Sequence, residues 1–137
     1  MAQTFLSAHH YAYDPATLAM VSETIIDLQA GTSNVITRAT DALGRSTGLS
    51  VAGVGDPGQP YSVTYGYDDF GRFAQVSNFQ FQASYSYLPG SSLVSGMTAS
   101  TGHAWTRSYE PQRNLITAVT NSFNGNLISA FDYANDA

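Results

Sequence analysis

The stretch that decides the fold is Tyr65-Gly66-Tyr67-Asp68-Asp69-Phe70-Gly71-Arg72-Phe73, near the middle of the 137-residue chain. Tyr65 and Tyr67 stand two positions apart, so their rings share one face of a β-strand. Asp68 opens a tight turn in which Gly71 takes the positive φ that the turn needs. Alternation of apolar and polar residues resumes at 73–78, which predicts the returning strand of a hairpin.

The same unit recurs along the whole chain. Its other copies are Tyr11-Ala12-Tyr13-Asp14, Arg38-Ala39-Thr40-Asp41, Tyr85-Ser86-Tyr87-Leu88, Arg107-Ser108-Tyr109-Glu110 and Phe131-Asp132-Tyr133. Asp14, Asp41 and Asp68 are 27 residues apart, and Asp41 also opens an Asp-x-x-Gly-Arg run that ends in Gly44 and Arg45. The later Tyr87, Tyr109 and Tyr133 follow at intervals of 20 to 24 residues. Such a period indicates a repeat architecture in which one supersecondary unit stacks on the next.

Composition limits both the fold class and the partners. Charged residues make up 11% of the chain and aromatic residues 12%, which favours ordered β-sheet. The chain has no Lys and a net charge of −5, so nucleic acid and anionic lipid are poor partners. It has no Cys, no export signal in Met1–Tyr13 and no apolar run long enough to insert into a membrane. Its length predicts a single domain, residues 1–137, large enough to bury a core.

The expected fold class is all-β, with consecutive antiparallel β-hairpins that form a curved repeat sheet, and barrel-like closure is left open. The Gly- and Pro-rich segment Gly53–Pro60 is interpreted as a long loop, and Asn124-Gly125 as a type I′ hairpin turn. Asn114 stands where the repeat has Gly and is expected to take its left-handed conformation. Other expected strands are Met20–Leu28, Val35–Thr40, Tyr61–Tyr67, Phe79–Tyr87 and Leu115–Thr120, and Pro15–Ser22 is also assigned as strand.

The candidate catalytic residues are Asp14, Asp41 and Asp68, which line up on one rim if they occupy equivalent turns. Two carboxylates close together raise one pKa and share a proton, as in an acid-acting peptidase. An Asp that opens a turn is more often there to accept hydrogen bonds from backbone amides. Turn chemistry is therefore the favoured interpretation, and a carboxylate pair is the alternative.

Other chemistry finds less support in the sequence. His9 and His10 are adjacent, so they point to opposite faces of a strand and only one of them could join a metal site with His103. The sequence has no His-x-His spacing. The G-x-G-x-x-G run that begins at Gly53 lacks a following helix and is interpreted as loop. Arg45 and Arg72 are expected to contact repeat tyrosines or a neighbouring Asp. We predict no metal and no cofactor.

The Tyr-Asp-x-x-Gly-Arg unit, best matched by Tyr65 to Phe73, resembles the YD repeat of the RHS protein family. The resemblance covers Tyr11 to Ala137, with departures at Thr17, Pro89-Gly90 and Asn114. It implies hairpins laid side by side in a spiralling sheet, which in full-length members forms a shell around a C-terminal effector. It also implies an extracellular or cell-surface protein. Because Asp136-Ala137 matches the start of Asp-x-x-Gly-Arg, the last repeat is expected to be truncated.

Two functions follow as hypotheses. The favoured one is a non-catalytic scaffold, interaction or shell module of a secreted or surface protein. It would bind a protein or glycoprotein surface and form a homo-oligomer through its open sheet edges. The alternative is a metal-independent, aspartic-type peptidase that uses two of the three repeat aspartates at acid pH. Carbohydrate binding is a third interpretation, which needs Trp105 or several Tyr rings open to solvent.

Overall fold

The computed structural model describes residues 6–53 and 61–136, and in these ranges it is all-β. Within them, no helix is long and apolar enough to cross a bilayer. The expected loop Gly53–Pro60, and with it the G-x-G-x-x-G run, lies outside the described residues from position 54 onward.

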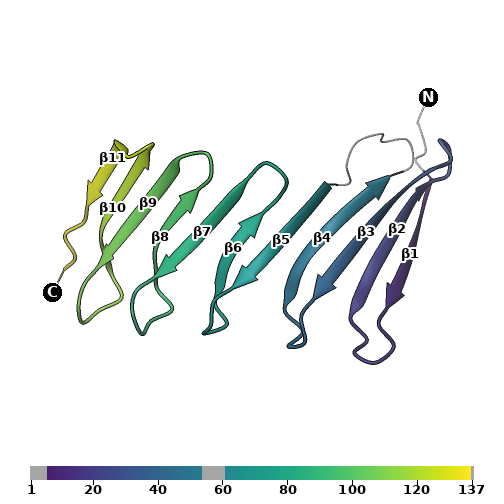
Figure 1. The fold of residues 1–137 in the computed structure, drawn as a ribbon, viewed down its shortest axis with the longest axis horizontal. Helices are drawn as coiled ribbons and strands as arrows, with labels where there is room; N and C mark the ends of the chain where they lie inside the picture. Colours follow the sequence, from purple (N-terminus) through teal and green to yellow (C-terminus); the bar gives the residue numbers. More distant parts are fainter. Residues whose placement is uncertain (1–5, 54–60, 137) are drawn as a thin grey trace. The chain divides into compact units, whose positions relative to one another are not determined.

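Eleven strands form one sheet in chain order, and neighbouring strands are antiparallel (Figure 1). The sheet is not closed, so the barrel-like alternative is wrong and the open arrangement of consecutive hairpins is confirmed. The strands are β1 (Ser7–Tyr13), β2 (Met20–Asp27), β3 (Thr32–Thr40), β4 (Ser46–Gly53), β5 (Tyr61–Tyr67), β6 (Phe73–Ser77), β7 (Gln82–Tyr87), β8 (Val94–Ala99), β9 (His103–Tyr109), β10 (Ile116–Phe123) and β11 (Asn126–Asp132).

The chain divides into two compact units, Met1–Thr64 and Tyr65–Ala137, which are described separately below. The first unit contains β1 to β4 and the start of β5, and the second contains the end of β5 and β6 to β11. That residues 1–137 fold as one domain stays a prediction.

The predicted strands lie where the structure has strands, and the two differ mainly in where each strand begins or ends. Tyr61–Tyr67 is confirmed as β5. The assignment of Pro15–Ser22 as strand is wrong for residues 15–19, because that segment forms the turn between β1 and β2. Asn124 and Gly125 have φ values of 48° and 77°, and positive φ at both positions is what a type I′ turn requires.

Five hairpin turns that follow the Tyr position of a repeat are closed by the same kind of backbone hydrogen bond, in a shorter and a longer form. In two of them the N–H groups of Asp41 and Asp68 donate to the carbonyls of Arg45 and Arg72, four residues ahead. The corresponding bond spans five residues in the other three, which join Asp14 to Ala19, Leu88 to Leu93 and Glu110 to Leu115. The repeats that depart from Asp-x-x-Gly-Arg therefore keep this closing hydrogen bond, but their turns are one residue longer.

The extra residue changes which position is left-handed. Gly44 and Gly71 both have φ of 77° in the short turns. In the longer turn after Asp14, Leu18 takes φ of 58°, a conformation that a Leu side chain disfavours. The left-handed conformation expected for Asn114 is wrong, since among the described residues only Leu18 and Asn124 have a positive φ without being Gly.

The expectation of a buried core is also wrong for the described part of the chain. Among those residues, the buried hydrophobic core consists of Ala83 alone, which is 3% exposed, and no large side chain is fully buried. A core needs two layers of secondary structure with apolar surfaces that face each other. The ring contacts of Phe73, for example, are with Tyr65, Tyr67 and Tyr85 of the same sheet.

Candidate interaction surface

The register of the strands gives the second unit one aromatic face. Residues directly opposite each other on antiparallel strands share a face, and alternate residues along a strand do the same. Tyr85 lies opposite Met97, Met97 opposite Trp105, and Val119 opposite Phe131. We define the aromatic face of this unit by its residues Tyr65, Tyr67, Phe73, Tyr85, Met97, Trp105, Arg107, Val119 and Phe131.

Phe73 contacts three other rings of this face. Its ring centroid lies 5.9 Å from that of Tyr65, 6.1 Å from that of Tyr67 and 5.5 Å from that of Tyr85. These separations and the tilted or edge-on orientations are typical of stabilising aromatic pairs. The prediction that Tyr65 and Tyr67 share one face is confirmed.

The opposite face of the second unit carries small residues. Ser86 lies opposite Gly96, Gly96 opposite Thr106, and Thr106 opposite Thr120. The hydroxyls of Thr106 and Thr120 are 2.7 Å apart and form a hydrogen bond across the strands. The two faces therefore differ in chemistry, and the aromatic face holds the larger apolar surface.

The first unit has a corresponding face with more charge. Its residues are His9, Tyr11, Glu23, Ile25, Ile36, Arg38, Leu49, Val51 and Val63. The carboxylate of Glu23 lies 3.0 Å from Nδ1 of His9 and 3.6 Å from Nη2 of Arg38. His9 also stacks on Tyr11, with ring centroids 6.4 Å apart. Among residues 6–53 and 61–136, no three His, Asp or Glu side chains gather to hold a metal ion.

Tyr87 and Tyr109 each link their own hairpin to the preceding one through the side-chain hydroxyl. The hydroxyl of Tyr87 donates to the Phe73 carbonyl at 2.6 Å, and that of Tyr109 donates to the Val94 carbonyl at 2.8 Å. Phe73 and Val94 both begin the second strand of the preceding hairpin. The repeat pattern identifies these tyrosines but not this bond, for which their recurrence at the ends of β7 and β9 is the signal.

Asp68 and Arg72 form an ion pair inside their own turn. One carboxylate oxygen of Asp68 accepts the backbone N–H groups of Phe70 and Arg72, and the other accepts Nε of Arg72 at 2.7 Å. Arg72 also stacks over the Tyr87 ring, with its guanidinium carbon 4.2 Å from the centroid, and donates to the Ser91 carbonyl. The prediction that this Arg contacts a repeat Tyr and an Asp is confirmed.

Asp41 and Arg45 repeat the same turn in the first unit. Oδ1 of Asp41 accepts the backbone N–H groups of Leu43 and Arg45, and Oδ2 accepts Nε of Arg45 at 2.7 Å. Asp14 has no Arg at this place, and Oδ1 of its carboxylate accepts the N–H groups of Ala16 and Thr17. All three candidate catalytic aspartates therefore stabilise turns.

Glu110 forms a similar ion pair within its turn, but with an Arg three residues ahead instead of four. Its two carboxylate oxygens accept Nε and Nη2 of Arg113 at 2.5 and 3.0 Å, a two-bond contact with an Arg three residues ahead. The longer Glu side chain reaches an Arg that is one position closer than in Asp-x-x-Gly-Arg. The Asp-x-x-Gly-Arg pattern does not indicate this role for Arg113.

These contacts set the titration of the turn carboxylates. The Thr17 backbone N–H is the main cause that holds the pKa of Asp14 below its usual value. Partial burial raises the pKa of Asp41 and Asp68, but hydrogen bonds from their own Arg residues outweigh it, so both pKa values are lowered. A shared proton would raise one pKa instead. No hydrogen bond joins any two of these aspartates within the described residues, so the geometry favours turn chemistry.

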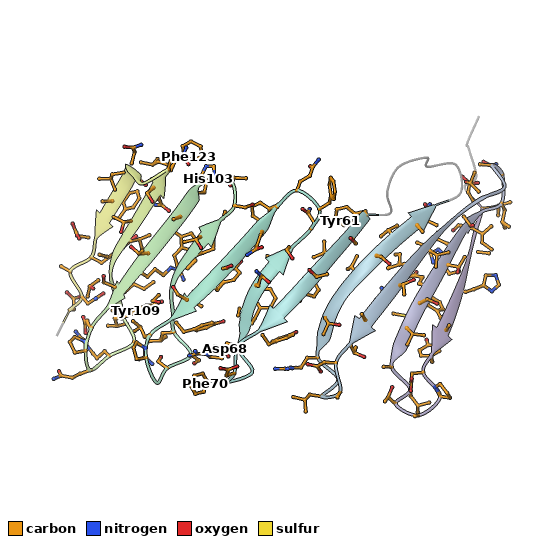
Figure 2. All side chains as sticks on the ribbon, viewed as in Figure 1. Tyr61, Asp68, Phe70, His103, Tyr109 and Phe123 are labelled. Atoms are coloured by element: carbon orange, nitrogen blue, oxygen red, sulfur yellow. The ribbon has the colours of Figure 1, made fainter. Side chains whose placement is uncertain are left out.

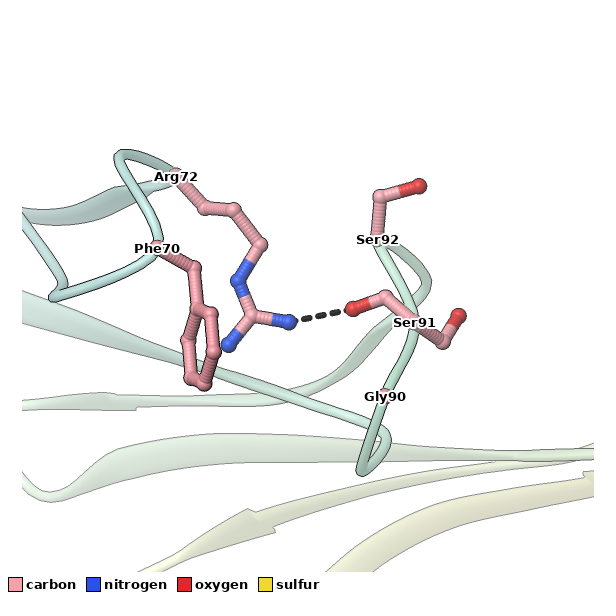
Figure 3. Close-up of a pocket in the computed structure, with 5 residues that line it drawn as sticks. All are labelled: Phe70, Arg72, Gly90, Ser91 and Ser92. Atoms are coloured by element: carbon pink, nitrogen blue, oxygen red, sulfur yellow. Dashed lines mark hydrogen bonds between the residues drawn. The ribbon is translucent and has the colours of Figure 1, made fainter.

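A shallow pocket of about 360 Å³ lies between two of these turns (Figure 3). Phe70 forms one wall and is 84% exposed, while Arg72 and Ser91 meet at the hydrogen bond drawn in the figure. Figure 2 shows Asp68 and Phe70 at this end of the strands and His103 and Phe123 at the other end. The His103 ring packs on Phe123 with centroids 4.7 Å apart, far along the strands from the turn carboxylates.

Arg107 is the one cation among the residues that define the aromatic face. Its guanidinium carbon lies 4.4 Å from the centroid of the Trp105 ring, a cation–π contact. Its Nε is buried and has no hydrogen-bond partner among the described residues. Buried polar groups are normally hydrogen-bonded, so this atom marks a place where an acceptor is missing.

No protein-family model and no curated protein sequence matches this chain. The resemblance to the RHS family, the extracellular or surface location and the truncated last repeat therefore stay predictions.

Proposed function

We propose that this chain is a non-catalytic β-repeat scaffold whose aromatic face binds another polypeptide. One observation carries the proposal: the described residues form a sheet with almost no buried core, in which Ala83 is the only buried hydrophobic residue. A large apolar surface that is rimmed by polar residues is typical of a protein interaction site.

The aromatic face supplies the chemistry that such a partner would need. Tyr, Trp, Met and Arg are enriched in protein interfaces, and Tyr85, Met97, Trp105 and Arg107 lie side by side on neighbouring strands. A carboxylate or carbonyl on the partner would satisfy the buried Nε of Arg107. The partner is therefore an apolar polypeptide segment that carries an acceptor, as part of a protein or glycoprotein at the cell surface or outside the cell.

The aspartic-type peptidase is less well supported by the same geometry. A general base must be free to reach a water or substrate, whereas Asp41 and Asp68 each bind two backbone N–H groups and one Arg. Their lowered pKa values favour the charged form of each carboxylate. Neither observation fits a pair that shares a proton.

The test measures binding and cleavage in one sample. A reduced, carboxymethylated, Trp-free polypeptide is titrated into the protein between pH 3 and 8. Trp105 is the only Trp, so its fluorescence reports binding at the aromatic face, and mass spectrometry detects any fragments. The scaffold predicts a saturable fluorescence change without fragments at every pH in the folded range.

Two neighbouring substitutions on β10 provide the matched comparison. Val119→Asp places a charge on the aromatic face, and Thr120→Asp places the same charge on the opposite face. We expect Val119→Asp to weaken binding at least roughly tenfold, the factor that about 1.4 kcal/mol produces, and Thr120→Asp to bind as the unmodified protein does. Acid-dependent fragments that disappear in folded Asp41→Asn and Asp68→Asn variants would instead establish the peptidase.

A further inference from the structure

Arg107 differs from the other arginines of this chain in its electrostatic partners. Each of the others forms an ion pair with a carboxylate of its own unit: Arg38, Arg45, Arg72 and Arg113. Arg107 forms no ion pair with any residue of 6–53 or 61–136. It is the exception in a chain that has ten Asp and Glu residues for five Arg.

The guanidinium of Arg107 is held in place and partly shielded from water. Its carbon lies 4.4 Å from the centroid of the Trp105 ring, and its Nε is buried without a hydrogen-bond partner among the described residues. The two terminal Nη atoms bond no described residue either, but they are not buried. A cation that water solvates incompletely interacts more strongly with an opposite charge than a fully exposed one does. The open Nη end is where such a charge can reach this cation.

Arg38 provides an internal precedent for the partner of an Arg at this repeat position. Both residues stand two positions before the Tyr position of their repeats, in Arg38-Ala39-Thr40 and Arg107-Ser108-Tyr109. On the corresponding face of the first unit, Nη2 of Arg38 lies 3.6 Å from a carboxylate oxygen of Glu23, on the neighbouring strand. None of the residues that define the aromatic face of the second unit is Asp or Glu. The described residues of that face therefore supply no counterpart of Glu23.

We infer that the polypeptide bound by the aromatic face places an Asp or Glu side chain on Arg107, in the role that Glu23 has toward Arg38. This partner chemistry rests on the proposed scaffold function and makes it more specific. The two carboxylate oxygens accept hydrogen bonds from Nη1 and Nη2, the planar two-bond arrangement that suits a guanidinium. Apolar side chains beside the carboxylate pack on Val119 and Phe131, which continue the row of Arg107 across the sheet.

A carboxylate suits Arg107 better than a backbone carbonyl of the partner does. A carbonyl accepts hydrogen bonds but leaves the positive charge without an opposite charge, whereas bonds between two ionised groups are about twice as strong as neutral ones. The net charge of −5 repels an acidic segment in general. Preference for carboxylates therefore requires a specific contact and does not arise from the overall field.

The test compares two forms of the Trp-free polypeptide described above at neutral pH. One form keeps its carboxylates, and in the other they are converted to neutral amides. A neutral dye on the polypeptide reports binding by fluorescence anisotropy, so the measurement does not depend on Trp105. The carboxylate preference is the dissociation constant of the amide form divided by that of the carboxylate form. We expect the preference to fall at least roughly tenfold in Arg107→Gln, which removes the charge.

Arg113→Gln is the matched control, because it changes the net charge by the same amount. Arg113 pairs with Glu110 in the turn after β9 and does not belong to the aromatic face. This variant should keep the carboxylate preference of the unmodified protein, and circular dichroism checks that both variants are folded. If Arg107→Gln is not folded, Arg107→Met keeps an apolar stem over Trp105 and should show the same fall.

The outcomes separate this contact from the scaffold function. An unchanged preference in a folded Arg107 variant, or an equal fall in Arg113→Gln, would overturn the assignment of the carboxylate to Arg107. If both forms bind alike and Val119→Asp still weakens binding, the scaffold function stands and only the carboxylate contact is lost. If the unmodified protein binds neither form, the scaffold function itself fails, and the carboxylate contact with it.

Discussion

Replacing Tyr87 with Phe removes one hydroxyl and leaves the ring in place. That hydroxyl donates to the Phe73 carbonyl at 2.6 Å, while the ring supports the guanidinium of Arg72 at 4.2 Å. The substitution therefore isolates the hydrogen bond between one hairpin and the preceding one. It also leaves a partly buried carbonyl with fewer partners.

The expected loss follows from the kind of bond. A neutral intramolecular hydrogen bond contributes about 1 kcal/mol net, within a range of roughly 0.5 to 1.5. Tyr109→Phe removes the equivalent bond to the Val94 carbonyl and should cost the same. The two bonds share no partner, so the double variant should lose about 2 kcal/mol. Urea unfolding followed by Trp105 fluorescence measures each loss in the unit that contains these bonds.

Tyr85→Phe is the control within the same strand. The Tyr85 ring packs against Phe73 at 5.5 Å, and its hydroxyl makes no hydrogen bond to a described residue. We expect its free energy of unfolding to stay within about 0.5 kcal/mol of the unmodified protein, as for most changes that remove no specific contact. If Tyr87→Phe lies in that same range, the hydroxyl does not link the hairpins and the reasoning is refuted.

Three further perturbations test the turns and the strand spacing. Folding lowers the pKa of Asp68, so the stability that its carboxylate contributes is present above the ordinary pKa of 3.8 and is lost as the pH falls through the lower folded value. In a plot of stability against pH, folded Asp68→Asn should therefore lose stability less steeply on the acid side. An unchanged slope would count against the ion pair. In thermal unfolding, Gly48→Ala should lower the free energy of unfolding by about 2 to 3 kcal/mol, because a Cβ at this position would meet the Val63 carbonyl oxygen. The Cβ of Gly31→Ala would meet nothing, so this control should lose only about 1 kcal/mol, for its φ of 64°. In the same assay, Leu18→Gly should stabilise the protein by about 1 kcal/mol, because Gly adopts the left-handed φ of this position without strain and the Leu18 side chain is 76% exposed. A loss of stability would show that Leu18 has a packing role.

The open sheet explains why this sequence combines many aromatic residues with few charges. Side chains on a strand pack against cross-strand neighbours even where no second layer exists. Phe73 contacts three rings in this way, and Arg72 is held between Asp68 and Tyr87. These lateral contacts hold neighbouring hairpins in register.

Local patterns in the sequence determined the hairpins. The spacing of Tyr65 and Tyr67, the Asp-x-x-Gly-Arg turns and Asn124-Gly125 each act within a few residues, so their structures follow from backbone geometry and short-range hydrogen bonds. For the same reason Arg72 could be assigned an internal contact. The strand expected at residues 15–19 is instead part of the turn that Asp14 opens, and its left-handed residue is Leu18, whose type does not indicate a turn.

The tertiary structure alone decided three features. Among the described residues the sheet buries little more than Ala83, because burial of apolar faces requires contacts between elements far apart in the chain, which no local pattern specifies. The tyrosine hydroxyls reach carbonyls 14 and 15 residues earlier in the chain, and only strand pairing brings these groups together. The carboxylates of the aspartates that recur every 27 residues each accept backbone hydrogen bonds within their own turn. A repeat period cannot reveal this, because it fixes the spacing of the residues along the chain and not the direction of a carboxylate.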